Sequence, residues 1–288
     1  MTDTHTIVWV DGKRLPPEGA HISARDRGFT LADGVFETMK ARNGKVFHLD
    51  RHLTRIDGAL RTLDIPPPPE LRDWVDSAIR AAHLPDASVR LTVSRGVSPG
   101  GVGVPSDPVP TVVVTVAPPP AFGAGIYEAG LTAHVASGRR NEHSITAGLK
   151  TLAYTDSVAA LIEARKAGAD EVLFLDTAGH CSEASASNLF AIIRGGLVTP
   201  PTTCAALPGI TRAVVIELAA ELGIPMDERP FGVDELTRSD EAFLTSSLRG
   251  VAPLVRVDGC AIGSGNPGAV TRKVMAAYAA LVQRECGA

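Results

Sequence analysis

The sequence predicts an α+β fold divided into two domains. Its 288 residues are enough for one large or two modest domains. Strand-like and helix-like segments follow one another without the strict alternation that builds a parallel sheet. A proline- and glycine-rich stretch, PPPAFGAG at 118–125, has the composition of a linker. We therefore expect a small N-terminal domain at 1–118, a linker at 119–127 and a larger C-terminal domain at 128–288.

The N-terminal part begins with two predicted hairpins. Asp11-Gly12 and Asn43-Gly44 separate strand-like runs, and such dipeptides favour the tight turns of hairpins. The segment that follows the second hairpin spaces its leucine and isoleucine residues as a helix does, and it ends before Pro66–Pro69. The expected helices cover 50–65 and 71–84, and two further strands are expected in 89–100 and 110–118.

The C-terminal part mixes strands with longer helices. The segment PGITRAVVIELAAELG is a clear helix, with Thr211 near its start and Gly223 just past its end. A polar loop at 138–150 leads into another expected helix at 151–168. The remaining expected strands are 131–137, 171–176, 188–196, 241–247 and 250–259, and the last expected helix is 270–286.

Composition excludes several classes of function. Hydrophobic residues make up 44% and charged residues 21%, and the net charge of -4 comes without a basic run, so no nucleic-acid partner is expected. The first residues lack the pattern of a signal peptide, and no apolar run is long enough to span a membrane, so we expect a cytoplasmic protein. The four cysteines have no metal-site spacing, so reduced thiols and no bound metal are expected; they are Cys181, Cys204, Cys260 and Cys286.

Two motifs match the residue patterns of catalytic or nucleotide-binding sites but lack the chemical groups that those sites need. Residues 96–100 read G-V-S-P-G, yet Pro99 has no N–H to donate to an oxyanion, so a flexible loop is favoured over a hydrolase elbow. Residues 263–268 read G-S-G-N-P-G before a helix, but the chain has no following strand with an acidic end. A glycine-rich turn is expected there.

Lys150 is the candidate for covalent chemistry. It follows a loop of small residues and is expected to open a helix whose next turn is mostly uncharged. An enzyme that uses pyridoxal 5′-phosphate needs such a lysine for a Schiff base, an acidic partner for the pyridine nitrogen and a cradle for the phosphate. Taken alone, a single lysine in such a sequence is most often a surface residue.

The stretch 147–192 resembles the central motif of class IV aminotransferases, also called fold type IV. This group includes branched-chain aminotransferases, D-amino-acid aminotransferases and aminodeoxychorismate lyases. The resemblance implies a pyridoxal 5′-phosphate enzyme with a small α/β domain and a larger domain around a barrel-like core. It implies that Lys150 forms the Schiff base and that Glu183 pairs with the pyridine nitrogen.

Further blocks of resemblance imply the rest of the cofactor site. The stretch 199–212 is similar to the cofactor loop of the family, in which Leu207 would pack on the ring and Ile210 and Thr211 would hold the phosphate. With Gly209 they stand at a helix N-terminus, which favours anions. The resemblance also assigns phosphate contacts to Arg51 in the opening block and to the turn formed by Ser246 and Ser247.

The residues that would bind the substrate follow less directly from the sequence. Phe36 stands where the family often has tyrosine, which leaves an apolar surface, and the paired arginine and histidine typical of D-amino-acid enzymes are absent at Gly100 and Val102. A substrate carboxylate needs a cation. The candidates are Arg27, Arg90 and Arg249. Arg90 alternates with buried-type residues, so it is either a substrate clamp or a surface ion-pair partner.

Three hypotheses on activity remain. The first is transfer of an amino group from a D-amino acid, a branched-chain amino acid or an (R)-amine to a 2-oxo acid such as pyruvate or 2-oxoglutarate. The second is a lyase that releases pyruvate from aminodeoxychorismate and leaves 4-aminobenzoate. The third is cofactor binding without turnover. The resemblance also implies a homodimer in which Arg27 or the 96–104 loop acts across the interface, with small-molecule amino and oxo acids as the other partners.

Overall fold

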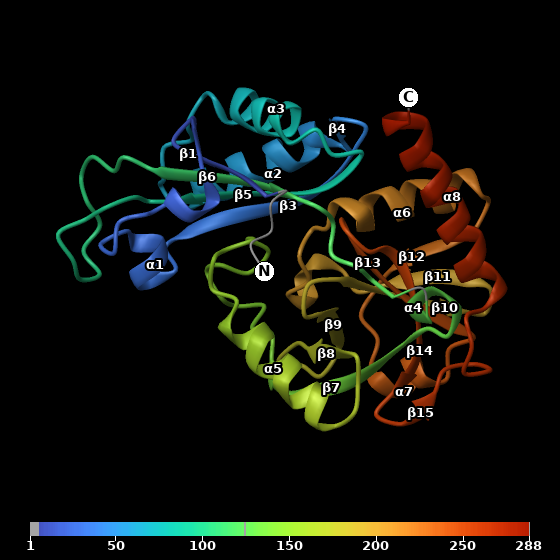
Figure 1. The fold of residues 1–288 in the computed structure, drawn as a ribbon. Helices are drawn as coiled ribbons and strands as arrows, with labels where there is room; N and C mark the ends of the chain where they lie inside the picture. The colour runs from blue at the N-terminus through green and yellow to red at the C-terminus, as the bar shows by residue number, and fades with distance from the viewer. Residues whose placement is uncertain (1–5, 124, 288) are drawn as a thin grey trace. The chain divides into compact units, whose positions relative to one another are not determined.

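The computed structural model describes residues 6–123 and 125–287, and these divide into two compact units. The first unit runs to Pro120 and takes up two later pieces, Leu149–Ala153 and the chain from Val282 on. The second unit comprises Ala121–Gly148 and Tyr154–Leu281. Both are drawn in Figure 1. The continuous domain boundaries that the sequence suggests remain a prediction.

The first unit is built on a six-stranded sheet with the order β2-β1-β6-β5-β3-β4. The two expected hairpin turns have positive φ at both central residues, 46° and 75° at Asp11-Gly12 and 49° and 75° at Asn43-Gly44, as primed turns require. The strands are β1 (Ile7–Val10), β2 (Lys13–Leu15), β3 (Gly34–Arg42), β4 (Lys45–Val46), β5 (Asp86–Ser94) and β6 (Thr111–Ala117).

Two helices, α2 (Leu49–Thr62) and α3 (Leu71–Ala82), cover one face of this sheet (Figure 1). Alternate residues of β5, namely Val89, Leu91 and Val93, are buried in the core that the helices share with the sheet. Arg90 is exposed on the opposite face, as the alternation predicts. A short helix α1 (Arg27–Leu31) and a 3-10 turn η1 (Pro17–Gly19) complete the unit.

The second unit contains a closed barrel, which confirms the barrel-like core expected from the sequence. Six strands follow one another in the order β10-β13-β14-β7-β8-β9, and β9 pairs again with β10 through Glu183 and Asn188. These strands are β7 (Leu131–Arg139), β8 (Glu171–Leu175), β9 (Cys181–Ala184), β10 (Asn188–Ile193), β13 (Glu241–Ser246) and β14 (Gly250–Val257). Three short strands extend this sheet: β11 (Gly196–Thr199), β12 (Met226–Glu228) and β15 (Cys260–Ala261).

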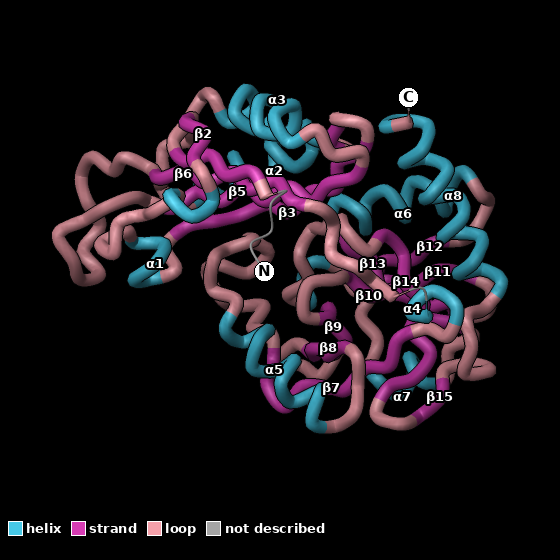
Figure 2. The backbone as a smooth tube through the Cα atoms, viewed as in Figure 1, coloured by secondary structure: helices cyan, strands magenta, loops and turns pink. Residues whose placement is uncertain are grey.

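The helices of this part of the chain are α4 (Gly125–Glu128), α5 (Thr155–Lys166), η2 (Thr202–Cys204), α6 (Ile210–Glu221), α7 (Val233–Thr237) and α8 (Ala269–Cys286). Figure 2 shows how they alternate with strands. The expectation that Lys150 opens a helix is wrong, because α5 begins only at Thr155. In the described residues, no helix has both the length and the apolar character needed to cross a membrane.

The two misleading motifs have structural explanations. A Cβ on Gly96, whose φ is +90°, would lie 1.8 Å from the carbonyl oxygen of Val109, so the backbone conformation requires glycine. A Cβ on Gly268 would lie 2.0 Å from the carboxyl carbon of Glu241. That carboxylate accepts hydrogen bonds from the N–H groups of Val270 and Thr271, so it occupies the helix terminus where a nucleotide phosphate would have to bind.

Candidate functional site

Lys150 is held by the sheet of the first unit. Its carbonyl oxygen accepts a hydrogen bond from the N–H of Phe36 at 3.0 Å, and Thr151 forms a bridge with Val35. The Leu152 N–H also donates to the Gly34 carbonyl at 3.0 Å, so the short segment Leu149–Ala153 pairs with β3 through an isolated bridge and precedes α5 rather than belonging to it. The Lys150 side chain is half-buried, and its Nζ lies 4.5 Å from the centre of the Phe36 ring.

Arg90 shares this side of the sheet with Lys150. Phe36 and Thr92 are cross-strand partners, and the Arg90 guanidinium lies 3.8 Å from the centre of the Phe36 ring. Its Nε also donates to the hydroxyl of Thr92 at 3.2 Å. Two cationic side chains thus contact one aromatic ring, an arrangement that is favourable by itself and that also attracts an anion. The structure therefore brings together three candidates, Phe36, Arg90 and Lys150.

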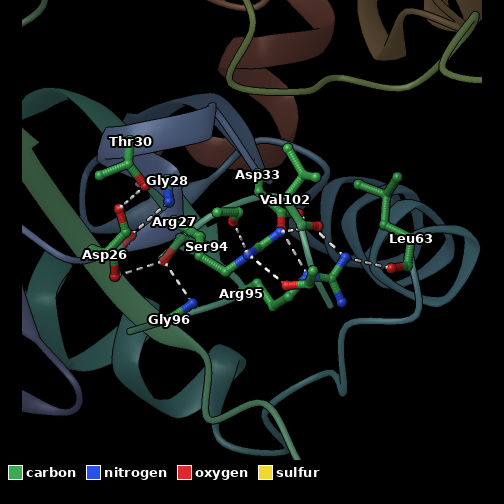
Figure 3. Close-up of polar contacts among 12 residues, drawn as sticks. Asp26, Arg27, Gly28, Thr30, Asp33, Leu63, Ser94, Arg95, Gly96 and Val102 are labelled. Atoms are coloured by element: carbon green, nitrogen blue, oxygen red, sulfur yellow. Dashed lines mark hydrogen bonds and ion pairs between the residues drawn. The ribbon is translucent and has the colours of Figure 1, made fainter. Parts of the chain in front are cut away.

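Arg27 is engaged differently, as Figure 3 shows. Its guanidinium is 4% exposed and forms an ion pair with Asp33 at 2.7 Å. Its Nη1 donates to the carbonyl oxygens of Gly101 and Gly103 at 3.1 and 2.9 Å. Arg95 pairs with the same carboxylate at 2.8 Å. Through these contacts Arg27 holds the 95–110 loop, which is drawn as a long pink segment in Figure 2. They do not support a role for Arg27 in binding the substrate.

Helix α2 carries Arg51 and Arg55 one turn apart. The expected phosphate ligand, Arg51, is half-buried. Arg55, which the sequence did not single out, donates to both carboxylate oxygens of the buried Glu37 at 2.7 Å. His52 contacts the same carboxylate at 2.7 Å. Burial disfavours a charge on Glu37, but these hydrogen bonds outweigh it and lower the pKa of the carboxyl group.

In the second unit, Glu183 and Asn188 fix the backbone of Leu207. Glu183 Oε2 accepts from the Leu207 N–H at 2.9 Å, and Asn188 Nδ2 donates to the Leu207 carbonyl at 2.8 Å. Glu183 and Asn188 are also the pair through which β9 and β10 close the barrel. The loop that carries Leu207 is therefore hydrogen-bonded to the two residues that close it. The structure thereby brings the expected acidic group and the expected ring contact together.

Arg140 is a further charged neighbour of Glu183 that the sequence did not reveal. Its Nε lies 3.6 Å from Glu183 Oε1, and its guanidinium stacks 4.1 Å from the centre of the Phe174 ring. Its Nη2 donates to Ser157 at 2.9 Å. Arg140 thus places a half-buried positive charge beside Glu183, the carboxylate expected to pair with a protonated pyridine nitrogen.

The N-terminus of α6 has the properties of an anion site. Its N-cap residue is Gly209, and no side chain caps the first turn. A Cβ at Gly209 would lie 2.0 Å from Asn188 Oδ1, so only glycine allows this approach. Ile210 and Thr211 form the first turn, and Thr211 is buried. The contrast with α8, whose terminus is filled by a carboxylate, supports a phosphate at α6.

The second expected phosphate turn lies between β13 and β14. Ser246 pairs with Gly250 across the turn that contains Ser247 and Arg249. Arg249 forms an ion pair with the buried Glu171 at 3.3 Å, and its carbonyl accepts from the hydroxyl of Tyr127. The position of Arg249 is thus held by groups of the second unit, and these contacts favour a structural role over capture of a substrate carboxylate.

The described residues include a lysine beside an aromatic ring, a carboxylate beside an arginine, and the uncapped N-terminus of α6. These groups indicate one class of protein. They are the groups that a pyridoxal-phosphate enzyme requires. The comparison with known families agrees, because the model for "Amino-transferase class IV" matches residues 34–257. The chain belongs to the class IV aminotransferase family.

Similar proteins cover nearly the whole chain. A protein of Methanocaldococcus jannaschii is 36% identical over 272 residues, which is 93% of each chain. The crystal structure of the Escherichia coli branched-chain amino acid aminotransferase has a TM-score of 0.92 at 30% identity and covers 96% of this chain and 94% of that one. The structure of 4-amino-4-deoxychorismate lyase from Pseudomonas aeruginosa has a TM-score of 0.85 at 32% identity and covers 98% and 100%.

The family defines the cofactor and the class of reaction. Class IV aminotransferases use pyridoxal 5′-phosphate, and this protein is a pyridoxal-phosphate-dependent transaminase with the fold type IV architecture. The residues present fit the cofactor: the first unit offers the amine of Lys150, and the second unit offers the carboxylate of Glu183 and the uncapped N-terminus of α6.

Proposed function

We propose that this protein transfers the amino group of a branched-chain amino acid to a 2-oxo acid such as 2-oxoglutarate. The relative with the TM-score of 0.92, a branched-chain aminotransferase, supports this choice of donor. Phe36 supports it physically, because an aromatic ring without a hydroxyl places no hydrogen-bonding group beside Lys150. D-amino acids and (R)-amines remain donors to be tested.

Each proposed cofactor contact has a physical reason. Lys150 holds the cofactor covalently, and Glu183 accepts the pyridine N–H. Leu207 packs on the ring, while the phosphate is held at the α6 terminus by the N–H groups of Ile210 and Thr211. Gly209 permits the close approach. The remaining phosphate contacts that we propose are Arg51, Ser246 and Ser247.

Bound pyridoxal 5′-phosphate supplies an electron sink for the bond that breaks at the substrate α-carbon. The chain supplies the proton transfer: Lys150 Nζ would take the proton from the substrate α-carbon and deliver it to the C4′ carbon of the cofactor. Arg90 orients the substrate by pairing with a carboxylate. The observation that carries this assignment is that Arg90 and Lys150 contact the same ring, that of Phe36.

A spectroscopic titration tests the proposal. The purified protein with cofactor is mixed with L-leucine, D-leucine, L-valine, D-alanine or (R)-phenylethylamine, and the visible band of the lysine-bound cofactor is recorded. We expect L-leucine or L-valine to convert this band to that of the amino form, and 2-oxoglutarate to restore it. Lys150→Ala must abolish the initial band. Conversion by the D-amino acids alone would refute the branched-chain assignment.

The lyase is the second candidate, because the lyase structure is 32% identical over 98% of this chain. Its cofactor contacts would be the same, so the donor titration has to decide. Release of pyruvate from aminodeoxychorismate, with no conversion by any amino acid, would establish the lyase. Retention of the band with every donor and no pyruvate release would leave a cofactor-binding protein without turnover.

The roles of Arg51 and Arg55 in α2 can be distinguished by experiment. Arg51→Ala is expected to weaken cofactor binding at least about tenfold, because it removes a charge-assisted contact to a phosphate. Arg55→Ala is expected to act on stability, because it leaves Glu37 without its bidentate partner. A loss of cofactor affinity in Arg55→Ala alone, at unchanged stability, would move the phosphate contact to Arg55.

We also propose that the chain forms a homodimer through the α1 region. The segment before α1 is tied to the loop after β5, since Asp26 bridges Val97 and Arg27 N–H donates to Gly96. Helix α1 and this loop expose large apolar side chains, including Phe29 at 72% and Val102 at 82% exposure. A second copy of the chain would cover them. Light scattering should show a dimer for the protein and a monomer for Phe29→Ser combined with Val102→Ser; a monomeric parent protein would contradict this.

A further inference from the structure

Three side chains with metal-binding atoms converge in the second unit, outside the proposed cofactor contacts. Asp176 and His180 bracket the turn between β8 and β9, and Cys204 ends the 3-10 turn η2. One carboxylate oxygen, one imidazole nitrogen and the sulfur lie within 4.8 Å of one another. Asp176 and Cys204 are almost fully buried, while His180 is half-buried.

We propose that Asp176, His180 and Cys204 bind a divalent transition-metal ion, with Zn²⁺ as the best match. Zn²⁺ takes thiolate, imidazole and carboxylate ligands at roughly 2.0–2.3 Å, usually in a tetrahedron. The donors of such a tetrahedron lie about 3.3–3.8 Å apart, given these bond lengths. Asp176 Oδ2 and His180 Nδ1 are already 3.1 Å apart. A hard ion such as Mg²⁺ is disfavoured, because it prefers six oxygen ligands.

The backbone around the cluster holds two of the ligands in place. The Asp176 N–H donates to the His180 carbonyl at 2.8 Å, and the His180 N–H donates to Asp176 Oδ1 at 2.7 Å. Glu142 accepts from the N–H of Thr177 in the same turn at 3.0 Å. Asp176 Oδ1 is thus used by the backbone, while Asp176 Oδ2 contacts the His180 imidazole at 3.1 Å. Metal sites depend on supporting hydrogen bonds of this kind.

The protons now in the cluster are those that a metal ion would displace. The Cys204 thiol donates a hydrogen bond to the Asp176 carboxylate, which also contacts the His180 imidazole at 3.1 Å. A bound metal ion would take the place of the thiol proton, because metal ions bind the thiolate form of cysteine. Without a metal the three side chains are joined by hydrogen bonds. A metal ion would therefore replace the protons that these atoms now share.

The consequence for the protein would be structural. Cys204 lies three residues before Leu207, and β9 carries Glu183. A metal bound by Cys204 and the β8–β9 turn would therefore cross-link the loop of Leu207 to the strand of Glu183. We expect it to stabilise the loop rather than to take part in the reaction. The inference does not depend on the identity of the amino donor.

The test uses Co²⁺ as a spectroscopic probe on the full chain after removal of metals with a chelator. We expect one equivalent to bind and to give the near-ultraviolet charge-transfer band of a cobalt–thiolate bond, and Zn²⁺ to displace it. Cys204→Ser should lose the band. The matched control Cys260→Ser changes an exposed cysteine and should keep it. His180→Ala should bind at least about 100-fold more weakly.

The result that overturns the proposal is the absence of a thiolate band at one equivalent, or a band that persists in Cys204→Ser. If Cys204→Ser does not fold, as judged by circular dichroism, His180→Ala decides, since that side chain is partly exposed and its removal spares the core. Binding that is unchanged in His180→Ala is then the outcome that removes the site.

Discussion

Asp33→Asn is the substitution whose effect on stability the structure specifies most fully. The carboxylate accepts from Arg27 at 2.7 Å and from Arg95 at 2.8 and 3.2 Å, and the two arginines are 4% and 5% exposed. Removing one partner of a buried ion pair costs about 3–5 kcal/mol, because a buried charge is left without compensation. Backbone carbonyls still bind both guanidinium groups, so we expect a loss of unfolding free energy near 3 kcal/mol.

The assay is urea unfolding of the protein, with thermal unfolding as a second readout. A loss of about 3 kcal/mol corresponds to a decrease in Tm of roughly 6–12 °C for a protein of this size class. The matched control is Asp107→Asn, which alters an exposed aspartate of the same 95–110 loop and should leave the unfolding free energy within about 0.5 kcal/mol. A loss below about 1 kcal/mol for Asp33→Asn would refute the reasoning.

The same carboxylate predicts a pH dependence. Burial opposes the charge on Asp33, but hydrogen bonds from Arg95 and Arg27 lower its pKa below the ordinary 3.8. An acid with a lowered pKa in the folded state contributes stability above its unfolded pKa and loses it as the pH falls through its folded pKa. The stability difference between the parent protein and Asp33→Asn should therefore be full at pH 7 and shrink below pH 3.8.

Two further substitutions address the site directly. Arg90→Lys keeps the charge but loses the planar fork, so the KM of the amino donor should rise about tenfold with little change in kcat; an unchanged KM in steady-state assays would exclude a clamp. Gly209→Ala places a methyl group 2.0 Å from Asn188 Oδ1, so the affinity for the cofactor in an absorbance titration should fall at least about tenfold. Gly232→Ala at the N-cap of α7 meets no atom within 4 Å and should bind the cofactor normally.

Local signals predicted much of the fold. The Asp11-Gly12 and Asn43-Gly44 turns were predictable because positive φ at both central residues is a property of the dipeptide itself. The long helices followed from apolar spacing, and α6 begins at Ile210, as the sequence indicated. The burial of alternate residues in β5 was equally predictable, because successive side chains of a strand point to opposite faces of the sheet.

The parts that could not be predicted depend on contacts between distant residues. The sequence placed Lys150 at the start of a helix, since nothing local shows that its segment pairs with β3, more than a hundred residues earlier. Arg140 stood in a polar loop with no spacing that tied it to Glu183. The cysteine spacing gave no sign of a metal site, because two of the proposed ligands flank a turn and Cys204 follows much later.

The closure of the barrel connects the fold to the proposed chemistry. Glu183 and Asn188 are the pair through which β9 meets β10, and the same side chains hold the N–H and the carbonyl of Leu207. Asn188 also limits position 209 to glycine at the terminus of α6. A residue that closes a barrel cannot move without cost, because its ladder partners are fixed. The proposed ring contact and the proposed phosphate site are therefore positioned by the folded barrel before any cofactor binds, which lowers the entropy that binding has to overcome.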